Sequence, residues 1–407
     1  MSEAVIVSTA RSPIGRAFKG SLQDVRPDDL AVTVVNAALA KISGLDPRLI
    51  QDLYLGCAEP SAEQGANLAR VVAVLAGFDH LPGATVNRFC ASSAQTTAMA
   101  FHAIRAGEGD VFISAGVECV SRYVDFAGPG GAKAETQNPK FAAAQARSTQ
   151  MAADNPTWTD PRDQRLLPDI YVAMGQTAEN VATSRGISRA RQDEWGVISQ
   201  NRAEKAIVDG FFAREITPIT TPDGTVVSTD DGPRAGVTLE AVSALRPVFR
   251  EAGTVTAGNC CPLNDGAAAL VIMSDARARD LGVAPLARVV ATAVSALSPE
   301  IMGMGPVESS RLALARAGMS IHDMDLIEMN EAFAAQVLAS VDDLGIDTDK
   351  LNVHGGAIAL GHPFGATGAR ITTTLLNGLT ARDGQFGLET MCIGGGQGMA
   401  IIFERLS

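Results

Sequence analysis

The two halves of this 407-residue chain resemble each other in sequence. The segment DPRLIQDLYLGCAE at residues 46–59 has a counterpart in SIHDMDLIEMNEAF at 320–333, and VNRFCASSAQTTAMAFHAI at 86–104 has one in LGHPFGATGARITTTLLNGL at 360–379. Phe89 then corresponds to Phe364. Related halves arranged about an approximate dyad would bring equivalent loops to one central place, where a composite active site can form. The alternative interpretation is an accidental similarity between two common α/β units.

Strand-like and helical segments alternate within each half, a pattern typical of an α/β fold. In the first half the pattern predicts strands at residues 4–8, 52–56, 85–89 and 110–116 and helices at 27–41, 67–76 and 92–106. In the second half it predicts strands at residues 287–294, 326–329 and 387–391 and a helix at 309–317.

Residues 121–245, between the halves, have a different character. Gly, Pro, Gln and Asp are frequent from 128 to 169, and one helical region is predicted at 175–210. The segment is therefore expected to be a loop-rich insertion that covers part of a ligand pocket.

Charge and hydropathy exclude several classes of protein. The chain has 33 Lys and Arg against 45 Asp and Glu, a net charge of −12, which argues against nucleic acid or an anionic membrane as the main partner. Apolar runs such as 71–78 and 266–273 are shorter than the ~18–20 residues that span a bilayer. The start of the chain has no basic segment, so we expect no signal peptide and a cytoplasmic location.

The cysteines show neither a C-x-x-C pair nor the spacing of metal ligands, so no metal site is predicted. In a chain of this size they indicate free thiols in a reducing compartment. The six are Cys57, Cys90, Cys119, Cys260, Cys261 and Cys392.

Cys90 lies in NRFCASS, at a predicted junction between a strand and a helix. The first N–H groups of a helix lack partners inside the helix, and the helix dipole favours a thiolate there. A small buried apolar residue is the ordinary interpretation of a free cysteine. His362 lies opposite Cys90 in the repeat, just before Pro363. A lone histidine is usually structural, but imidazole is also the usual base that activates a thiol.

Cys392 begins CIGGGQG, directly after the predicted strand at 387–391. The three glycines expose N–H groups that could hold a developing oxyanion, although phosphate binding or tight packing would also explain them. Asn330 follows the strand at 326–329, where its ordinary role would be to cap the next helix.

Four segments, in this order along the chain, resemble the signature segments of the thiolases, the acetyl-CoA acyltransferases: NRFCASS, MNEAFAAQ, NVHGGAIALGHPFGATGAR and MCIGGGQGMA. RSPIGRAFKG, MGQTAENVA and ALRPVFREAGTVTAGNCCPLNDGAAA also match, so the resemblance covers essentially the whole chain. It implies two halves, each with a mixed five-stranded sheet, stacked with helices as αβαβα layers. It assigns residues 1–120 with 246–275 to the N-terminal half, 121–245 to a loop domain that acts as a lid and binds CoA, and 276–407 to the C-terminal half.

The resemblance also implies a chemical mechanism. The Cys90 thiolate, activated by His362, would attack the 3-keto carbon of a 3-ketoacyl-CoA and form an acyl-enzyme while acetyl-CoA leaves. Incoming CoA would then take the acyl group. Cys392 would exchange the carbon-bound proton of acetyl-CoA. His362 and a water held by Asn330 would form one oxyanion site, and the N–H groups of Cys90 and Gly394 would form the other.

CoA is expected as a substrate, with no permanently bound cofactor. By the same resemblance, Arg234 would lie near the adenine end of CoA, and Leu245 and Phe249 along the pantetheine tunnel. Met174 and Cys261 are further candidates for contact with the substrate. The ordinary interpretation of these residue types is a surface arginine and apolar packing. The resemblance also implies a homodimer or a homotetramer.

Three positions depart from the pattern of the family. Cys261 and Pro262 stand where many members have Ser-Gly, which puts the CoA contact there in doubt. Ala173 stands where acetoacetyl-specific biosynthetic members often have His, which favours a degradative or broader 3-ketoacyl-CoA thiolase. His354 stands where many relatives have Asn, and we interpret it as structural.

Three alternatives remain beside a degradative thiolase. The first is a biosynthetic acetoacetyl-CoA thiolase, that is, an acetyl-CoA C-acetyltransferase. The second is a β-ketoacyl synthase, which Cys392 argues against. The third is a non-catalytic acyl-CoA-binding protein, which the presence of all four reactive residues argues against.

Overall fold

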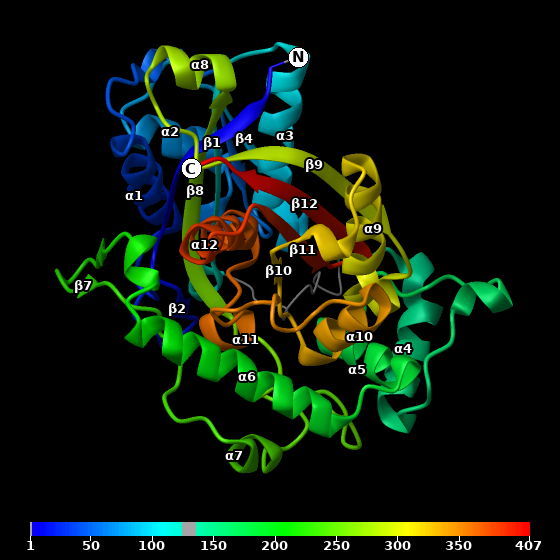
Figure 1. The fold of residues 1–407 in the computed structure, drawn as a ribbon. Helices are drawn as coiled ribbons and strands as arrows, with labels where there is room; N and C mark the ends of the chain where they lie inside the picture. The colour runs from blue at the N-terminus through cyan, green and yellow to red at the C-terminus, as the bar shows by residue number, and fades with distance from the viewer. Residues whose placement is uncertain (1, 124–135) are drawn as a thin grey trace.

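The computed structural model describes residues 2–123 and 136–407; residue 1 and residues 124–135, within the expected insertion, lie outside the described residues (Figure 1). The first half contains β1 (Ala4–Arg11), β2 (Gly15–Arg16), α1 (Pro27–Ala40), β3 (Asp52–Gly56), α2 (Leu68–Leu75), β4 (Gly83–Val86), α3 (Ser92–Ala106) and β5 (Val111–Cys119). The insertion contains α4 (Ala142–Asp154), α5 (Met174–Arg185), α6 (Arg189–Val208), β6 (Ile219–Thr220), β7 (Val226–Val227) and α7 (Leu239–Ser243). The chain continues with β8 (Asn264–Ser274), α8 (Asp275–Asp280), β9 (Ala287–Ala296), α9 (Gly305–Ala317), β10 (Leu326–Met329), α10 (Ala334–Leu344), α11 (Ala357–Leu360), α12 (Thr367–Arg382), β11 (Phe386–Ile393) and β12 (Gln397–Arg405).

The main strands form one mixed sheet in the order β10-β11-β12-β9-β1-β8-β5-β3-β4. The sequence repeat appears in this order, because β1, β8, β5 and β3 occupy the places that β9, β12, β11 and β10 occupy in the other half. Leu53 pairs with Ile113, and Ile327 pairs in the same parallel way with Leu388. The duplicated mixed α/β fold is therefore confirmed.

The structure differs in two details from the two five-stranded sheets that the resemblance implies. First, β1 and β9 pair at Val5–Arg288 and Ile6–Ala287, which joins the two halves into one sheet. Second, the counterpart of β4 in the second half is reduced to an isolated bridge between Ile327 and Leu351.

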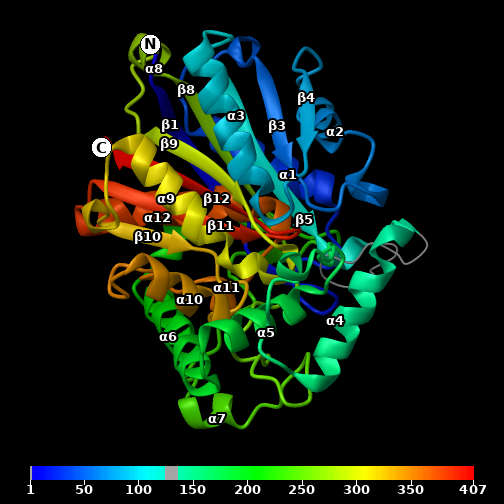
Figure 2. The ribbon, with the colours of Figure 1, turned by 90° about the vertical axis from the view of Figure 1, so that its right-hand side faces the viewer.

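The alternation of side chains along the strands creates the layers (Figures 1 and 2). On β8, Val271 and Met273 face an apolar cluster with α1 and α2, whereas Leu270 and Ile272 face α3 and α12. On β12, Ile402 faces a third cluster with α9 and α10. Helices α3 and α12 therefore lie in the central layer, between the two halves of the sheet.

Two predicted boundaries in the chain were wrong for local reasons. The strand predicted at 85–89 ends at Val86, because Phe89 has a left-handed backbone with φ of +45°. The helical region predicted at 175–210 is two helices. Gly186, with φ of +65°, ends α5, and the Ser188 side chain caps α6 by accepting the N–H of Arg191.

The insertion lies along one side of both halves, at the bottom of Figure 1, where α6 runs beneath α10 and α11. A buried cation on β1 helps to hold it there. The Arg11 side chain donates to the carboxylates of Glu215 and Asp230, both in the insertion. Within the described residues, no helix is long and apolar enough to span a bilayer. Over the same ranges, no group of His, Cys, Asp or Glu side chains is arranged to hold a metal ion.

Candidate active site

Cys90 lies in a tight turn at the start of α3. The Asn87 side chain accepts the N–H of Phe89 at 2.8 Å, and the Ser92 hydroxyl donates to the Phe89 carbonyl at 2.6 Å. A left-handed backbone in a residue other than glycine costs ~1–2 kcal/mol, and these side chains help to hold it at Phe89. A 3₁₀ turn, Phe89–Ala91, then leads into α3. The predicted junction of strand and helix is thus a strained turn that carries the thiol.

Cys90 and Cys392 approach each other from the two halves. Cys90 is partly exposed, and Cys392, on β11, is fully buried. Burial raises the pKa of the Cys90 thiol to about 11, although hydrogen bonds from the N–H groups of Gly394 and of Cys90 itself oppose this increase. Burial also raises the pKa of Cys392, and the charge of a Cys90 thiolate raises it further. Both residues are therefore thiols at neutral pH.

His362 is 1% exposed and held at both ring nitrogens. Its Nδ1 lies 2.6 Å from the Thr367 hydroxyl, which itself donates to the Pro363 carbonyl at 2.9 Å. The Thr367 oxygen therefore accepts the proton of Nδ1. On the other side, Nε2 lies 3.2 Å from the side-chain nitrogen of Asn330 and accepts from it. Burial, and then the charge of Arg370, lower the pKa of His362 to about 3, so the ring is neutral and its Nε2 lone pair accepts from Asn330.

Asn330 has one side-chain oxygen without a partner among the described residues, although the residue is 99% buried. Its nitrogen is occupied by His362. A buried amide oxygen without a partner costs free energy, and a water molecule can satisfy it. Asn330 does not cap a helix, because α10 begins only at Ala334. The neighbouring Glu331 supports the loop by accepting hydrogen bonds from Trp195, Ser199, Asn352 and Ile358.

The glycine turn after Cys392 packs closely against the segment that contains Leu297. Gly395 and Gly396 have left-handed backbones, and a Cβ at Gly396 would lie 2.3 Å from the Leu297 carbonyl. Only glycine fits there without strain. The turn directs the Gly394 N–H toward the Cys90 sulfur. The two predicted N–H donors, of Cys90 and Gly394, therefore meet at the thiol.

The insertion reaches this turn through the start of α5. The sulfur of Met174 lies 3.7 Å from the position that a Cβ at Gly394 would take. Met174 and Phe249 pack against one apolar cluster that also contains Cys392 and Phe333. The structure thus brings two of the predicted substrate contacts to the thiols.

Of the other predicted CoA contacts, Cys261 lies near the thiols, whereas Leu245 and Arg234 are exposed. The N–H of Cys261 donates to the Ala332 carbonyl at 3.1 Å. Burial raises the pKa of the Cys261 thiol, and the charges of Cys260, Cys90 and Cys392 raise it further, which places it beside the reactive thiols. Leu245 is 38% exposed. Arg234 is exposed, and its N–H donates to Gln200 on α6. Among the described residues, neither Leu245 nor Arg234 belongs to the apolar cluster that contains Cys392.

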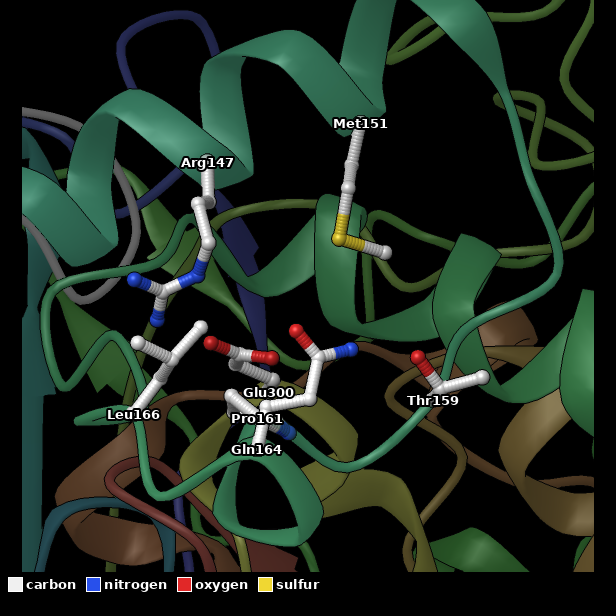
Figure 3. A pocket seen from close by; sticks show the side chains of 7 residues that line it. All are labelled: Arg147, Met151, Thr159, Pro161, Gln164, Leu166 and Glu300. Atoms are coloured by element: carbon white, nitrogen blue, oxygen red, sulfur yellow. The ribbon is translucent and has the colours of Figure 1, made fainter.

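A separate pocket lies within the insertion and against Glu300 (Figure 3). Its two charged side chains already form hydrogen bonds within the protein. Glu300 accepts the indole N–H of Trp158 and the N–H of Asp169, and Arg147 donates to the Leu167 carbonyl. Neither a thiol nor an imidazole lines it. We therefore do not place the chemistry there.

Comparison with known proteins gives a consistent result over the whole chain. The family model for the N-terminal domain of thiolase matches residues 4–276, and the model for its C-terminal domain matches residues 283–405. The chain belongs to the thiolase family. A 3-ketoacyl-CoA thiolase of Bacillus subtilis is 43% identical over 417 residues, which is 99% of this chain and all of that relative.

Two further members of the family are similar to this chain over its full length. An acetyl-CoA acetyltransferase of Escherichia coli is 43% identical over the full length of both chains. The crystal structure of human mitochondrial 3-ketoacyl-CoA thiolase in complex with CoA matches with a TM-score of 0.85 and 35% identity. That match covers 100% of this chain and 98% of the human one.

Sequence reasoning did not identify the residue that orients His362. Thr367 is the first residue of α12, five positions after the histidine. A hydroxyl at the start of the helix was the available signal, but many helices begin this way. The structural interpretation of His354 agrees with its surroundings, because its ring stacks on Phe211 at 3.6 Å between centroids.

Proposed function

We propose that this chain is a 3-ketoacyl-CoA thiolase, an acyltransferase that cleaves 3-ketoacyl-CoA with CoA to acetyl-CoA and a shortened acyl-CoA. The proximity of the Cys90 and Cys392 thiols, together with the hydrogen bond between Asn330 and Nε2 of His362, is the observation that carries the proposal. A reversible Claisen reaction needs a nucleophile, a proton carrier for carbon and donors for oxyanions, and this set contains all three.

In the first half-reaction, Nε2 of His362 takes the Cys90 proton and the sulfur attacks the 3-keto carbon. The bond between C2 and C3 then breaks, which leaves an acyl group on Cys90 and the carbanion of acetyl-CoA. Cys392 donates its proton to that carbanion, and acetyl-CoA leaves. The high pKa of the buried Cys392 thiol suits it to exchange a proton with carbon.

In the second half-reaction, the thiol of CoA loses its proton to the thiolate of Cys392 and attacks the acyl group on Cys90. The shortened acyl-CoA leaves, and Cys90 recovers its proton from His362. The N–H groups of Cys90 and Gly394 hold one oxyanion, while His362 and a water on the free oxygen of Asn330 hold the other.

We assign CoA binding to the loop domain at residues 121–245, between an N-terminal half of 1–120 with 246–275 and a C-terminal half of 276–407. The contact of Met174 with the Gly394 turn supports this assignment, and Phe249 of the N-terminal half packs against the same cluster as Cys392. The CoA complex of the human relative supports CoA as the ligand. Cys261, Leu245 and Arg234 are proposed further along the CoA arm, and no permanent cofactor is invoked.

We also propose a homo-oligomer that works in fatty-acid β-oxidation in the cytoplasm. Among the described residues, strand β4 is at the edge of the sheet and pairs with β3 alone. Leu75 beside it is 53% exposed, and Phe89 next to Cys90 is 42% exposed. A second copy would bury these apolar groups. Static light scattering should give a dimer or a tetramer, and a monomer would contradict the proposed homo-oligomer.

The six free thiols support the proposed cytoplasmic location, because free thiols are typical of a reducing compartment.

An acetyl-CoA C-acetyltransferase is the second candidate, because the Escherichia coli relative is as similar as the Bacillus subtilis one. Intact mass spectrometry after mixing with acetoacetyl-CoA and with a medium-chain 3-ketoacyl-CoA separates the two. Acyl label on Cys90 from both substrates, discharged by CoA, is expected. Label from acetoacetyl-CoA alone would favour the second candidate, and label from neither would contradict both.

A further inference from the structure

Glu118, at the end of β5, joins several loops around the thiols. It is fully buried, and its Oε1 accepts hydrogen bonds from the side chains of Gln64 and Tyr123 at 2.8 and 2.7 Å. Its Oε2 accepts the N–H groups of Ala58 and Gly365, each at 2.8 Å. No cation pairs with it among the described residues. A buried carboxylate without a cation beside it is costly even when donors surround it, so this arrangement needs an explanation.

The sequence repeat supplies the explanation, because Gly365 is the counterpart of Cys90. Both follow the equivalent Phe89 and Phe364, and both lie in a 3₁₀ turn that leads into a central helix. The N–H of Cys90 is a proposed oxyanion donor. The N–H of Gly365 is its duplicate in the other half, and it donates to an oxygen of Glu118. Glu118 therefore supplies the anion at the second copy of the oxyanion site.

This contact holds the segment that carries His362. The N–H of His362 donates to Asn264 on β8 at 2.9 Å, and three residues later Gly365 is held by Glu118 on β5. Gly365 also fits closely against β5, because a Cβ there would lie 2.4 Å from the Val117 carbonyl. The segment of the second half that carries His362 is thus fixed at two points, by Asn264 and by Glu118, to strands of the first half, which carries Cys90.

We propose that Glu118 is a positioning residue for the reaction, which fills the duplicate oxyanion site at Gly365 and thereby sets the His362 segment against Cys90. The inference rests on the proposed function. Misplacement of a catalytic group by ~1 Å can cost ~100-fold in rate. The charge of Glu118 also contributes, after burial, to the high pKa of the Cys90 thiol.

Glu118→Gln tests the inference with little change in volume. The amide keeps one acceptor oxygen. Its NH₂ group, however, must face N–H and O–H groups that donate to the carboxylate in the wild-type protein. We expect acylation of Cys90 by acetoacetyl-CoA, measured by quenched-flow mass spectrometry, to slow by ~10–100-fold with little change in KM. Loss of the negative charge should also shift the rise of the acylation rate with pH toward lower pH.

Glu179→Gln is the matched control. Glu179 is also fully buried and accepts backbone N–H groups, those of Thr254 and Val255, away from the His362 segment. It should lower stability without shifting the pH profile of acylation, because its charge does not contribute to the pKa of the Cys90 thiol. Losses of rate in both variants in proportion to their loss of stability would overturn the inference.

Glu118→Asp keeps the charge but retracts the carboxylate. This variant tests the inference if Glu118→Gln does not fold. It should slow acylation without moving the pH profile, and a wild-type acylation rate in either folded variant would overturn the inference. The wild-type protein separates this failure from that of the proposed function. If it forms no acyl-Cys90 at all, the thiolase activity fails; if it does, only the role of Glu118 is tested.

Discussion

Cys90 carries its proton in the resting site, because the raised pKa of its thiol and the lowered pKa of His362 both favour the neutral pair. Alkylation by iodoacetamide requires the thiolate. The rate of Cys90 alkylation should therefore rise ~tenfold per pH unit from pH 7 to pH 10 and level off only near pH 11. Peptide mapping after timed alkylation measures this rate, and a plateau below pH 8 would indicate a thiolate–imidazolium pair instead.

The two cysteines should be separable by substitution, because only Cys392 handles the proton on carbon. Cys392→Ala should still accept an acetyl group from acetyl-CoA on Cys90, since thioester exchange moves no carbon-bound proton. Its thiolysis of acetoacetyl-CoA should fall by at least ~100-fold, the lower range for loss of an acid–base group. Cys90→Ala should form no acyl-enzyme. Acyl label on Cys392 instead of Cys90 would reverse the assigned roles.

At the scale of elements, the contact between α3 and α12 controls how the two catalytic turns meet. A Cβ at Gly368 on α12 would lie 2.2 Å from the Ala94 nitrogen on α3, whereas one at Gly378 would meet only side-chain atoms, the tip of Leu326 at 3.0 Å and the His354 ring at 3.2 Å. Gly368→Ala should lower the free energy of unfolding by ~1–3 kcal/mol and slow acylation.

Gly378→Ala is the comparison within the same helix, where the gain in helix propensity offsets the tighter packing. It should change the free energy of unfolding by less than ~1 kcal/mol. Urea unfolding followed by circular dichroism measures both variants. Equal effects would show that the α3–α12 contact tolerates expansion.

The elements also show what local sequence can predict. The bounds of β3, α3 and β10 agree with their periodic apolar patterns, and a left-handed Gly107 ends α3. The end of β4 was missed because a side chain of Asn87 stabilises an unusual backbone. The contact of Glu118 with Gly365, separated by 247 positions, lies beyond any local pattern. Motifs therefore identified the candidate reactive groups, but not the residues that hold them.

At the scale of the whole molecule, Arg11 holds the insertion onto the first half. Its guanidinium is fully buried between Glu215 and Asp230. Arg11→Ala would leave buried carboxylates without their cation, so we expect a loss of ~3–5 kcal/mol in the free energy of unfolding.

Arg191→Ala is the matched control for that loss, because the pair of Arg191 with Asp342 is exposed on both sides. Exposed pairs contribute ~0–1 kcal/mol. Both variants are compared by urea unfolding. A loss in Arg11→Ala no larger than in the control would contradict the role of the buried pair.

The pairing of β1 with β9 has a consequence for any attempt to divide the chain. Only two residue pairs join these strands, but each strand shields the open edge of the other. A fragment that ends near residue 276 would lack β9 and α12. It would therefore expose the edge of β1 together with the apolar face of α3 that packs against α12. Exposed strand edges recruit other strands, so such a fragment would aggregate or pair with itself. Each half is therefore a partner for the other, and neither is an independent folding module.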